Sequence, residues 1–165
     1  MDDHASFELP GTGTLTIASV QPWRTYELRR AVLRPHQSRE EMGSLDSAHP
    51  DAAVVAAVVE ATGEVVSTAA VFPEQAPEAL AAVVPDGAHW RLRGMATRED
   101  LRGSGVGAAV LTVALSHVAR HGGVAVWCNA RVGARSFYER AGFATFGAQW
   151  VDPLIGPHVV MWRQI

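Results

Sequence analysis

The chain has 165 residues, of which 48% are hydrophobic and 19% are charged, and this composition predicts a single globular domain with its own core. The formal net charge of −3 argues against a nucleic-acid partner, because nucleic-acid binding usually depends on a basic face. All 14 basic residues are arginines, which excludes a Schiff base on a protein lysine and a P-loop nucleotide site.

The sequence also bears on the cellular setting and on metal chemistry. Cys128 is the single cysteine, so neither an internal disulfide nor a cysteine-rich zinc site can form, and we expect no metal. Residues 1–13 carry acidic side chains and lack the apolar segment of a secretory signal. No apolar run approaches the roughly 18 residues of a membrane helix. We therefore expect a cytoplasmic protein without membrane contact.

The pattern of apolar residues predicts a loose, flexible N-terminal tail over residues 1–13 and one folded domain over residues 14–165. In chain order, the predicted elements of the domain are a strand at 14–20, a helix at 23–33, a short helix after Ser38, a β-hairpin of 53–60 and 65–72, a strand at 90–96, a helix at 106–121, a strand at 124–129, a helix at 133–141, and strands at 143–150 and 158–163. Hairpins need antiparallel neighbours, whereas a strand–helix–strand unit needs parallel ones. We therefore predict an α/β fold with a single mixed sheet of about seven strands flanked by about four helices.

A glycine-rich loop, Arg102-Gly103-Ser104-Gly105-Val106-Gly107, lies between the predicted strand at 90–96 and the helix that follows it. Glycine has no Cβ, so the backbone N–H groups of such a loop stay accessible to a ligand. The first amides of a helix have no partner within the helix, and the helix dipole favours negative charge there. The loop is therefore a candidate phosphate or pyrophosphate site with Arg102 as a charged donor, and the alternative is a plain turn.

A dinucleotide-binding loop is a further interpretation, since Gly103, Gly105 and Ala108 have the G-x-G-x-x-G/A spacing. That fingerprint usually opens the first strand–helix unit of its domain, whereas this loop lies past the middle of the chain. About 20 residues later, where a carboxylate should bind the ribose, the chain has Val126 and Trp127. These departures disfavour a dinucleotide without excluding it.

Two segments together resemble the Gcn5-related N-acetyltransferases (GNAT). Residues 95–107, MATREDLRGSGVG, resemble the family's acetyl-CoA signature, in which an apolar strand and a short charged linker precede Arg/Gln-x-x-Gly-x-Gly/Ala. Residues 134–143, ARSFYERAGF, look like the family's Ala-x-x-x-Tyr-x-x-x-Gly-Phe helix and turn. The two motifs occur in the family's order, and the predicted strand order from residue 14 agrees with it. The resemblance implies a GNAT fold with a splayed sheet and acetyl-CoA (coenzyme A) as co-substrate.

The resemblance also implies where that co-substrate binds. The pantetheine arm would pair as an added strand with Met95, Ala96 and Thr97. The pyrophosphate would bind the loop formed by Arg102, Gly103, Ser104, Gly105, Val106 and Gly107. A bulge near Gly94 would open the sheet, and a backbone N–H near Met95 or Ala96 would meet the oxyanion. The family often has an asparagine where this chain has Arg131, so both Arg131 and Asn129 are candidates for a contact with pantetheine.

Acetyl transfer to an amine needs one group that takes a proton from the amine and another that stabilises the departing thiolate. Tyr138 matches the family tyrosine that stands near the sulfur and is the candidate general acid, with core packing as its alternative role. A phenol with a reference pKa of about 10 protonates a thiolate only by an uphill step, so a hydrogen bond can be its main contribution. His158 is the candidate base, because it begins the last strand near the expected opening of the sheet, and water is the alternative.

We therefore predict an enzyme that transfers acetyl from acetyl-CoA to a primary amine of a small molecule or peptide. The alternatives are another acyl-CoA donor, and a non-catalytic acyl-CoA sensor or interaction module, which has no need of Tyr138. We expect the acceptor site to be shaped by the first helices and by segments 35–50 and 73–89. Dimerisation is common in the family, so a homodimer is one option for this chain.

Overall fold

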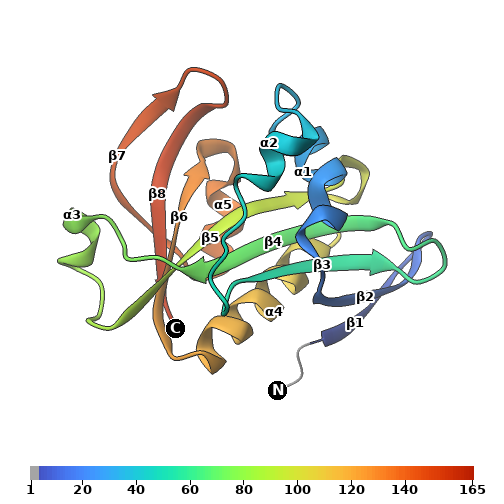
Figure 1. Cartoon of the computed structure of the whole chain (residues 1–165), viewed down its shortest axis with the longest axis horizontal. Helices are drawn as coiled ribbons and strands as arrows, with labels where there is room; N and C mark the ends of the chain where they lie inside the picture. The colour runs from blue at the N-terminus through green and yellow to red at the C-terminus, as the bar shows by residue number, and fades with distance from the viewer. Residues whose placement is uncertain (1–3) are drawn as a thin grey trace.

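The computed structural model describes residues 4–165, which form one mixed sheet with helices on both faces (Figure 1). The eight strands of this part of the chain are β1 (His4–Leu9), β2 (Gly13–Ser19), β3 (Ala53–Val59), β4 (Val65–Pro73), β5 (Ala88–Thr97), β6 (Gly123–Arg131), β7 (Ala144–Asp152) and β8 (Gly156–Gln164). Its α-helices are α1 (Tyr26–Leu33), α2 (Arg39–Gly43), α3 (Glu78–Ala81), α4 (Val106–Arg120) and α5 (Arg135–Arg140). Short 3₁₀ turns occupy Pro22–Thr25, Glu99–Leu101 and Val132–Ala134.

The strands lie in the order β1-β2-β3-β4-β5-β6-β8-β7. Adjacent strands are antiparallel except for β5 and β6, which run parallel because α4 connects them as a crossover. The predicted hairpin is confirmed as β3 and β4, and the predicted strand–helix–strand unit as β5, α4 and β6. The α/β class and the mixed sheet are confirmed, and the described residues contain one strand and one helix more than the approximate numbers expected.

The additional strand corrects the prediction of a loose tail. His4–Leu9 is β1 and pairs with β2 along its whole length, with Phe7 opposite Leu15. Ala5, Phe7 and Leu9 alternate with polar residues, so their side chains face the core together. Three alternating apolar residues are only a weak indication of a strand, and the pairing with β2 is what stabilises the extended conformation of this segment. Residues 1–3 of the predicted tail lie outside the described part of the chain.

The short helix predicted after Ser38 is confirmed as α2, which begins with a complete capping box. The Ser38 hydroxyl accepts a hydrogen bond from the Glu41 N–H at 3.2 Å, and the Glu41 carboxylate accepts one from the Ser38 N–H at 2.6 Å. The bond from the Ser38 N–H lowers the pKa of Glu41 because it stabilises the carboxylate. This capped start positions α2 and the loop after it, so that Met42 and Leu45 reach a cavity at the sheet.

β5 and β6 separate part-way along their length, and Figure 1 shows them diverging. Their pairing ends at Arg91 opposite Trp127, so the residues of β5 beyond Arg91 pair with β4 alone. A β-bulge lies in the same stretch, where Gly94 and Met95 oppose the single β4 residue Ala69. Gly94 has a φ of 62°, a left-handed conformation that glycine adopts without strain. The expected bulge and the expected opening of the sheet are therefore both present.

Both faces of the sheet carry apolar side chains, and helices pack on each face near the point where β5 and β6 separate. On one face, buried residues of α4 pack with Tyr138 of α5 and with Phe143 in the main core. On the other face, Leu80 of α3 packs with Trp127 of β6 in a smaller core. In Figure 1, α4 passes behind the sheet, whereas α1 and α2 lie in front of it. The separated ends of β5 and β6 thus lie between α1 on one face of the sheet and α4 on the other.

Candidate functional site

A long groove of about 1250 Å³ runs between α4, α5 and the far end of β5. We call it the α4–α5 groove. Its lining includes most of the residues predicted to bind the co-substrate, namely Met95, Ala96, Thr97, Arg102, Gly103, Gly105, Gly107 and Arg131. Four predicted residues do not line it. Asn129 and Tyr138 line a neighbouring cavity instead. The Ser104 hydroxyl donates to the Leu101 carbonyl at 2.6 Å, and Val106 is buried in the core. The side chains of Ser104 and Val106 therefore support the loop from within.

The glycine loop exposes a set of unpaired amides to this groove. Gly103 and Gly105 have φ values of 77° and 90°, so the loop turns through conformations that favour glycine. Within residues 4–165, the N–H groups of Gly103, Gly105, Gly107 and Ala108 have no hydrogen-bond acceptor. A Cβ at position 107 would lie 3.0 Å from the Thr97 hydroxyl, so glycine keeps α4 close to β5. The start of α4 therefore has the donors that an anion would need, and we call it the amide cradle.

The groove is also lined by two arginines and an aromatic ring that were not among the predicted residues. Besides Arg102 and Arg131, the lining contains Arg140 and Arg163, and Phe137 lies beside them. Arg163 donates to the Ala141 carbonyl at 2.8 Å, which holds its guanidinium near the end of α5. Sequence analysis missed both arginines. Arg140 lies inside the second quoted motif, whereas Arg163 is brought to the groove only by the tertiary fold, which places β8 beside the end of α5. Phe137 lies inside the second quoted motif, next to Tyr138, and could have been named from it.

A second cavity of about 320 Å³ lies beside the groove, and we call it the arginine cavity. It contains both candidate catalytic residues, Tyr138 and His158, together with five arginines, Arg29, Arg34, Arg91, Arg93 and Arg131. Four residues line the groove and this cavity alike: Leu33, Met95, Arg131 and Ala134. The two spaces therefore meet at the point where β5 and β6 separate. Asn129 lines the arginine cavity alone, so of the two candidates for pantetheine contact only Arg131 reaches the groove.

Tyr138 is 6% exposed and lies with its ring against Phe137 and Phe143 in the core. Within residues 4–165 its hydroxyl has no hydrogen-bond partner, although the residue lines the arginine cavity. Burial raises its pKa well above the ordinary value of 10.0, because the phenolate loses its hydration there. The phenol therefore stays protonated at neutral pH and can donate a hydrogen bond into the cavity.

His158 is the third residue of β8 and is 4% exposed. Its Nδ1 lies 2.7 Å from the Gly156 carbonyl oxygen, and a carbonyl can only accept, so Nδ1 carries the hydrogen. Nε2 of the neutral ring is then a free acceptor. The ring stacks on Trp150 with centroids 5.6 Å apart, which fixes its orientation. The local geometry thus gives His158 the tautomer that a base needs.

Cys128 also lines the arginine cavity, but its chemistry is that of a buried core residue. It is 2% exposed, and burial raises the pKa of its thiol to about 12. A thiol with such a pKa carries almost no thiolate at neutral pH. Within residues 4–165, no three histidine, cysteine, aspartate or glutamate side chains gather as metal ligands would. In the same part of the chain, no helix has the length and hydropathy needed to cross a bilayer.

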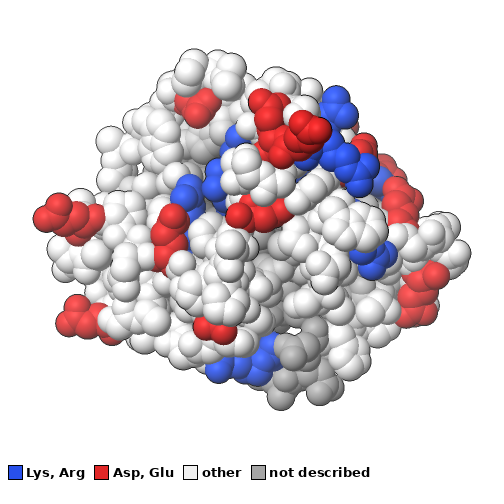
Figure 2. All heavy atoms as spheres, in the orientation of Figure 1, with Lys and Arg blue, Asp and Glu red and all other residues white. Residues whose placement is uncertain are grey.

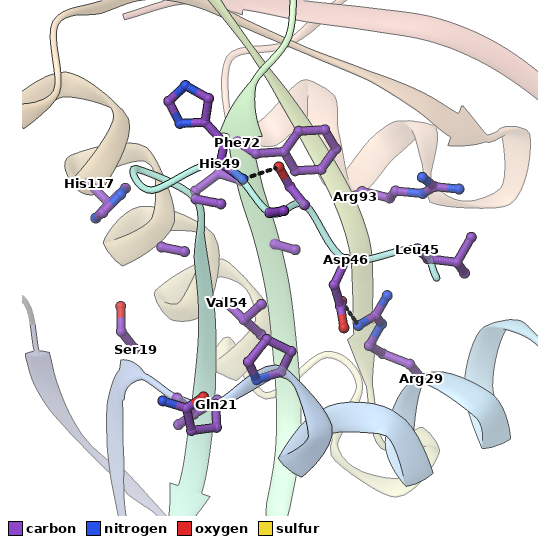
Figure 3. A pocket seen from close by; sticks show the side chains of 18 residues that line it. Ser19, Gln21, Arg29, Leu45, Asp46, His49, Val54, Phe72, Arg93 and His117 are labelled. Carbon is purple, nitrogen blue, oxygen red and sulfur yellow. Dashed lines mark hydrogen bonds and ion pairs between the residues drawn. The ribbon is translucent and has the colours of Figure 1, made fainter. Parts of the chain in front are cut away.

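A third cavity, of about 310 Å³, continues from the arginine cavity across the face of β3 and β4 (Figure 3). Arg29, Leu45 and Arg93 line both spaces. In Figure 3 these residues lie at one end with Asp46, whereas Ser19 and His117 lie at the other end. Of the segments expected to shape the acceptor site, the stretch 45–49 lines these cavities and no residue of 73–89 does. That second segment instead packs under β6 through Leu80.

Comparisons with known proteins agree with this geometry. The sequence model described as Acetyltransferase (GNAT) family matches residues 15–143. A Bacillus subtilis (strain 168) protein described as "Uncharacterized N-acetyltransferase YitI" is 32% identical over 151 residues, which is 92% of this chain and 97% of that protein. The GNAT domain of S. lividans PAT has a TM-score of 0.70 at 15% identity, covering 98% of this chain and 97% of that one.

A structure of aminoglycoside 6'-N-acetyltransferase complexed with coenzyme A has a TM-score of 0.68 at 16% identity. The match covers 90% of this chain and 96% of that one. The family match spans most of the chain, and the relatives share its fold over almost their whole length. The chain belongs to the GNAT family of acetyltransferases and has the GNAT fold.

Proposed function

We propose that this protein transfers an acetyl group from acetyl-CoA directly to a primary amine of a small molecule or peptide. The observation that carries the proposal is the junction between the α4–α5 groove and the arginine cavity, where Met95, Arg131 and Ala134 line both spaces. Direct transfer requires two substrates to meet at one point in a fixed geometry. A groove that ends at a second cavity provides such a point.

The donor set of the groove fits coenzyme A. Unpaired amides at the start of α4 and the guanidinium of Arg102 suit a pyrophosphate, and β5 beyond Arg91 has an edge without a strand partner on its β6 side. That edge can pair with the amide groups of a pantetheine arm. Acetyl-CoA would supply an acetyl group activated as a thioester. The neighbour with bound coenzyme A, at 16% identity, supports this assignment.

The chain's own residues would then do three things. A backbone N–H at Met95 or Ala96 in the bulged strand would donate to the carbonyl oxygen as negative charge develops on it. His158 Nε2 would take the proton that the amine nitrogen releases as the new C–N bond forms. The Tyr138 hydroxyl would donate to the sulfur as the C–S bond breaks, and its raised pKa favours a hydrogen bond over complete proton transfer.

Thiol release at saturating acetyl-CoA, measured with a panel of primary amines, tests the proposal. Release that depends on an amine and yields the N-acetyl product by mass spectrometry is expected. Saturable acetyl-CoA binding with no release for any amine would favour a non-catalytic sensor instead. A sensor has no need of an arginine cavity that opens onto the groove. Propionyl-CoA in the same assay separates an acetyl donor from a longer acyl donor, and an NADH titration tests the dinucleotide alternative.

His158→Gln tests the base, since it keeps a hydrogen-bonding side chain but removes the ring that accepts a proton. We expect kcat to fall about 100-fold, the lower part of the range for general-base catalysis. His36→Gln is the matched control, because His36 is exposed and lines none of the three cavities. Unchanged kcat in His158→Gln would assign the proton transfer to water.

A further inference from the structure

The arginine cavity has a pronounced excess of positive charge. Its five arginines face a single lining carboxylate, Asp152. Figure 2 shows arginine atoms gathered in a hollow between the β7–β8 side and the α1–α2 side of this face. The net charge of the whole chain is −3, so this concentration of one sign is local.

Ion pairs neutralise only part of this charge. Arg29 pairs with Asp46 at 2.8 Å, and Arg91 pairs with Glu74 at 3.0 Å. The side chains of Arg34 and Arg93, by contrast, have no ion pair and no hydrogen bond with another residue of the stretch 4–165, although the backbone of Arg34 bonds to Arg30 and Gln37. Arg131 donates to the Leu33 carbonyl, which carries no charge. Asp152 attracts Arg34 and Glu74 attracts Arg93 only from beyond ion-pair distance. The cavity therefore presents guanidinium groups that have no direct anionic partner within residues 4–165.

Arg29 provides a second and independent observation. Its side chain is 3% exposed, yet its Nε has no hydrogen-bond acceptor. A Cβ at position 94 would lie 3.1 Å from that Nε, so Gly94 lets β5 approach the Arg29 side chain closely, and both residues line the arginine cavity. A buried donor without an acceptor is costly, and an oxygen of a ligand placed there would satisfy it.

The charge state of the cluster agrees with this picture. Burial lowers the pKa of Arg93, and the nearby charges of Arg91, Arg34 and Arg29 lower it further. Burial also lowers the pKa of Arg34, with Arg131 as the next cause. Both effects arise because positive groups lie together away from water. A bound anion would raise both pKa values, because it would stabilise the charged guanidinium groups.

We propose that the acceptor is an amine that also carries an oxyanion, a carboxylate or a phosphate, which binds to Arg93, Arg34 and the Nε of Arg29. The amine end would then point to the junction with the groove near Met95. The proposal rests on the proposed acetyl transfer and names the chemical class of its acceptor. A planar guanidinium fork suits both kinds of oxyanion, so the chemistry that recognises them is shared.

Matched amine pairs test the proposal by kinetics at saturating acetyl-CoA. Phosphoethanolamine is compared with ethanolamine, and β-alanine with β-alaninamide. The anionic member of at least one pair should have a kcat/KM at least about tenfold higher, because its oxyanion accepts charge-assisted hydrogen bonds that the neutral member cannot accept. The pair with the larger ratio distinguishes phosphate from carboxylate. Equal or faster reaction of the neutral member in both pairs would overturn the proposal.

Arg93→Gln should lower the ratio of kcat/KM for the anionic amine to kcat/KM for its neutral partner about tenfold or more, mainly through a higher KM for the anionic amine. Arg93→Lys should restore part of the preference. Arg39→Gln is the control, because Arg39 is exposed, pairs with Glu27 and lines none of the three cavities. Loss of preference in both glutamine variants would assign the effect to net charge and overturn the proposal.

A binding measurement separates this inference from the proposed function. Inorganic phosphate is titrated into the protein saturated with coenzyme A, and the arginine Nε–H signals are followed by NMR. The Arg29 and Arg93 signals should shift in a saturable way, and Arg93→Gln should weaken the response. The absence of any shift up to tens of millimolar would overturn the oxyanion site. A shift without turnover of any amine would contradict the proposed function and leave the oxyanion site standing.

Discussion

The Tyr138 hydroxyl tests the proposed chemistry sharply, because Tyr138→Phe removes one oxygen atom from a ring that the core already holds. The ring packs against Phe137 and Phe143, and those contacts survive the substitution. The hydroxyl has no partner within residues 4–165, so its loss leaves no other group unpaired. The free energy of unfolding should therefore change by less than about 1 kcal/mol.

The expected kinetic effect follows from the same environment. Burial raises the pKa of Tyr138, so the phenol contributes a hydrogen bond to the departing sulfur. Hydrogen bonds to a charged group contribute about 1.5–3 kcal/mol, which corresponds to a fall in kcat of roughly 10- to 150-fold. Because the phenol stays protonated well beyond pH 9, the ratio of wild-type to variant kcat should be constant between pH 7 and pH 9.

The assay is thiol release at saturating substrates, with acetyl-CoA affinity measured by calorimetry and stability by thermal unfolding. We expect a lower kcat, an acetyl-CoA affinity within about threefold of wild type, and a midpoint of thermal unfolding that stays close to that of wild type. Equal kcat in the two proteins would refute the role of Tyr138 at the sulfur. A ratio that falls steeply between pH 7 and pH 9 would refute the argument from burial.

Three further predictions concern the groove, the core and the buried thiol. Gly105→Ala and Gly63→Ala each place a Cβ at positive φ, 90° and 74°, so both variants should lose about 1–2 kcal/mol of stability. Calorimetry should show weaker acetyl-CoA binding in Gly105→Ala alone. Equal acetyl-CoA affinity in the two variants would contradict the amide cradle. Gly123→Ala should lower the free energy of unfolding by about 2 kcal/mol or more in chemical denaturation, because its Cβ would lie 2.7 Å from the Trp90 ring. A loss below about 0.5 kcal/mol would show that the core can rearrange around the added methyl group. Cys128, whose pKa burial raises to about 12, should react with iodoacetamide at pH 8 at least about 100-fold more slowly in the folded protein than in urea, and equal rates would contradict its burial.

The features that the sequence predicted well have local causes. The loop at Gly103 and Gly105 is visible because glycine is needed where φ is positive and where a ligand approaches the backbone. The capping box at Ser38 depends on a spacing of three residues within one turn of helix. The bulge at Gly94 was indicated by a glycine inside a strand pattern, and the register with β4 confirms it.

The features that were missed depend on contacts distant in sequence. β1 is a strand because β2 supplies its partners, and its own alternation around Phe7 is short. The arginine cavity combines Arg29 and Arg34 from the α1 region with residues of β5 and β6. The spacing of Arg91 and Arg93 places both on one face of a strand, which could have indicated a charged surface. Only the tertiary fold brings α1 over that face.

The account as a whole depends on where the two substrates meet. A crystal structure of the protein with bound acetyl-CoA measures this directly. We predict the pyrophosphate on the amides of the glycine loop and the thioester at the junction lined by Met95 and Ala134, with the sulfur within about 3.5 Å of the Tyr138 oxygen. A pyrophosphate bound elsewhere, or a thioester that lies away from this junction and from Tyr138, would contradict the account.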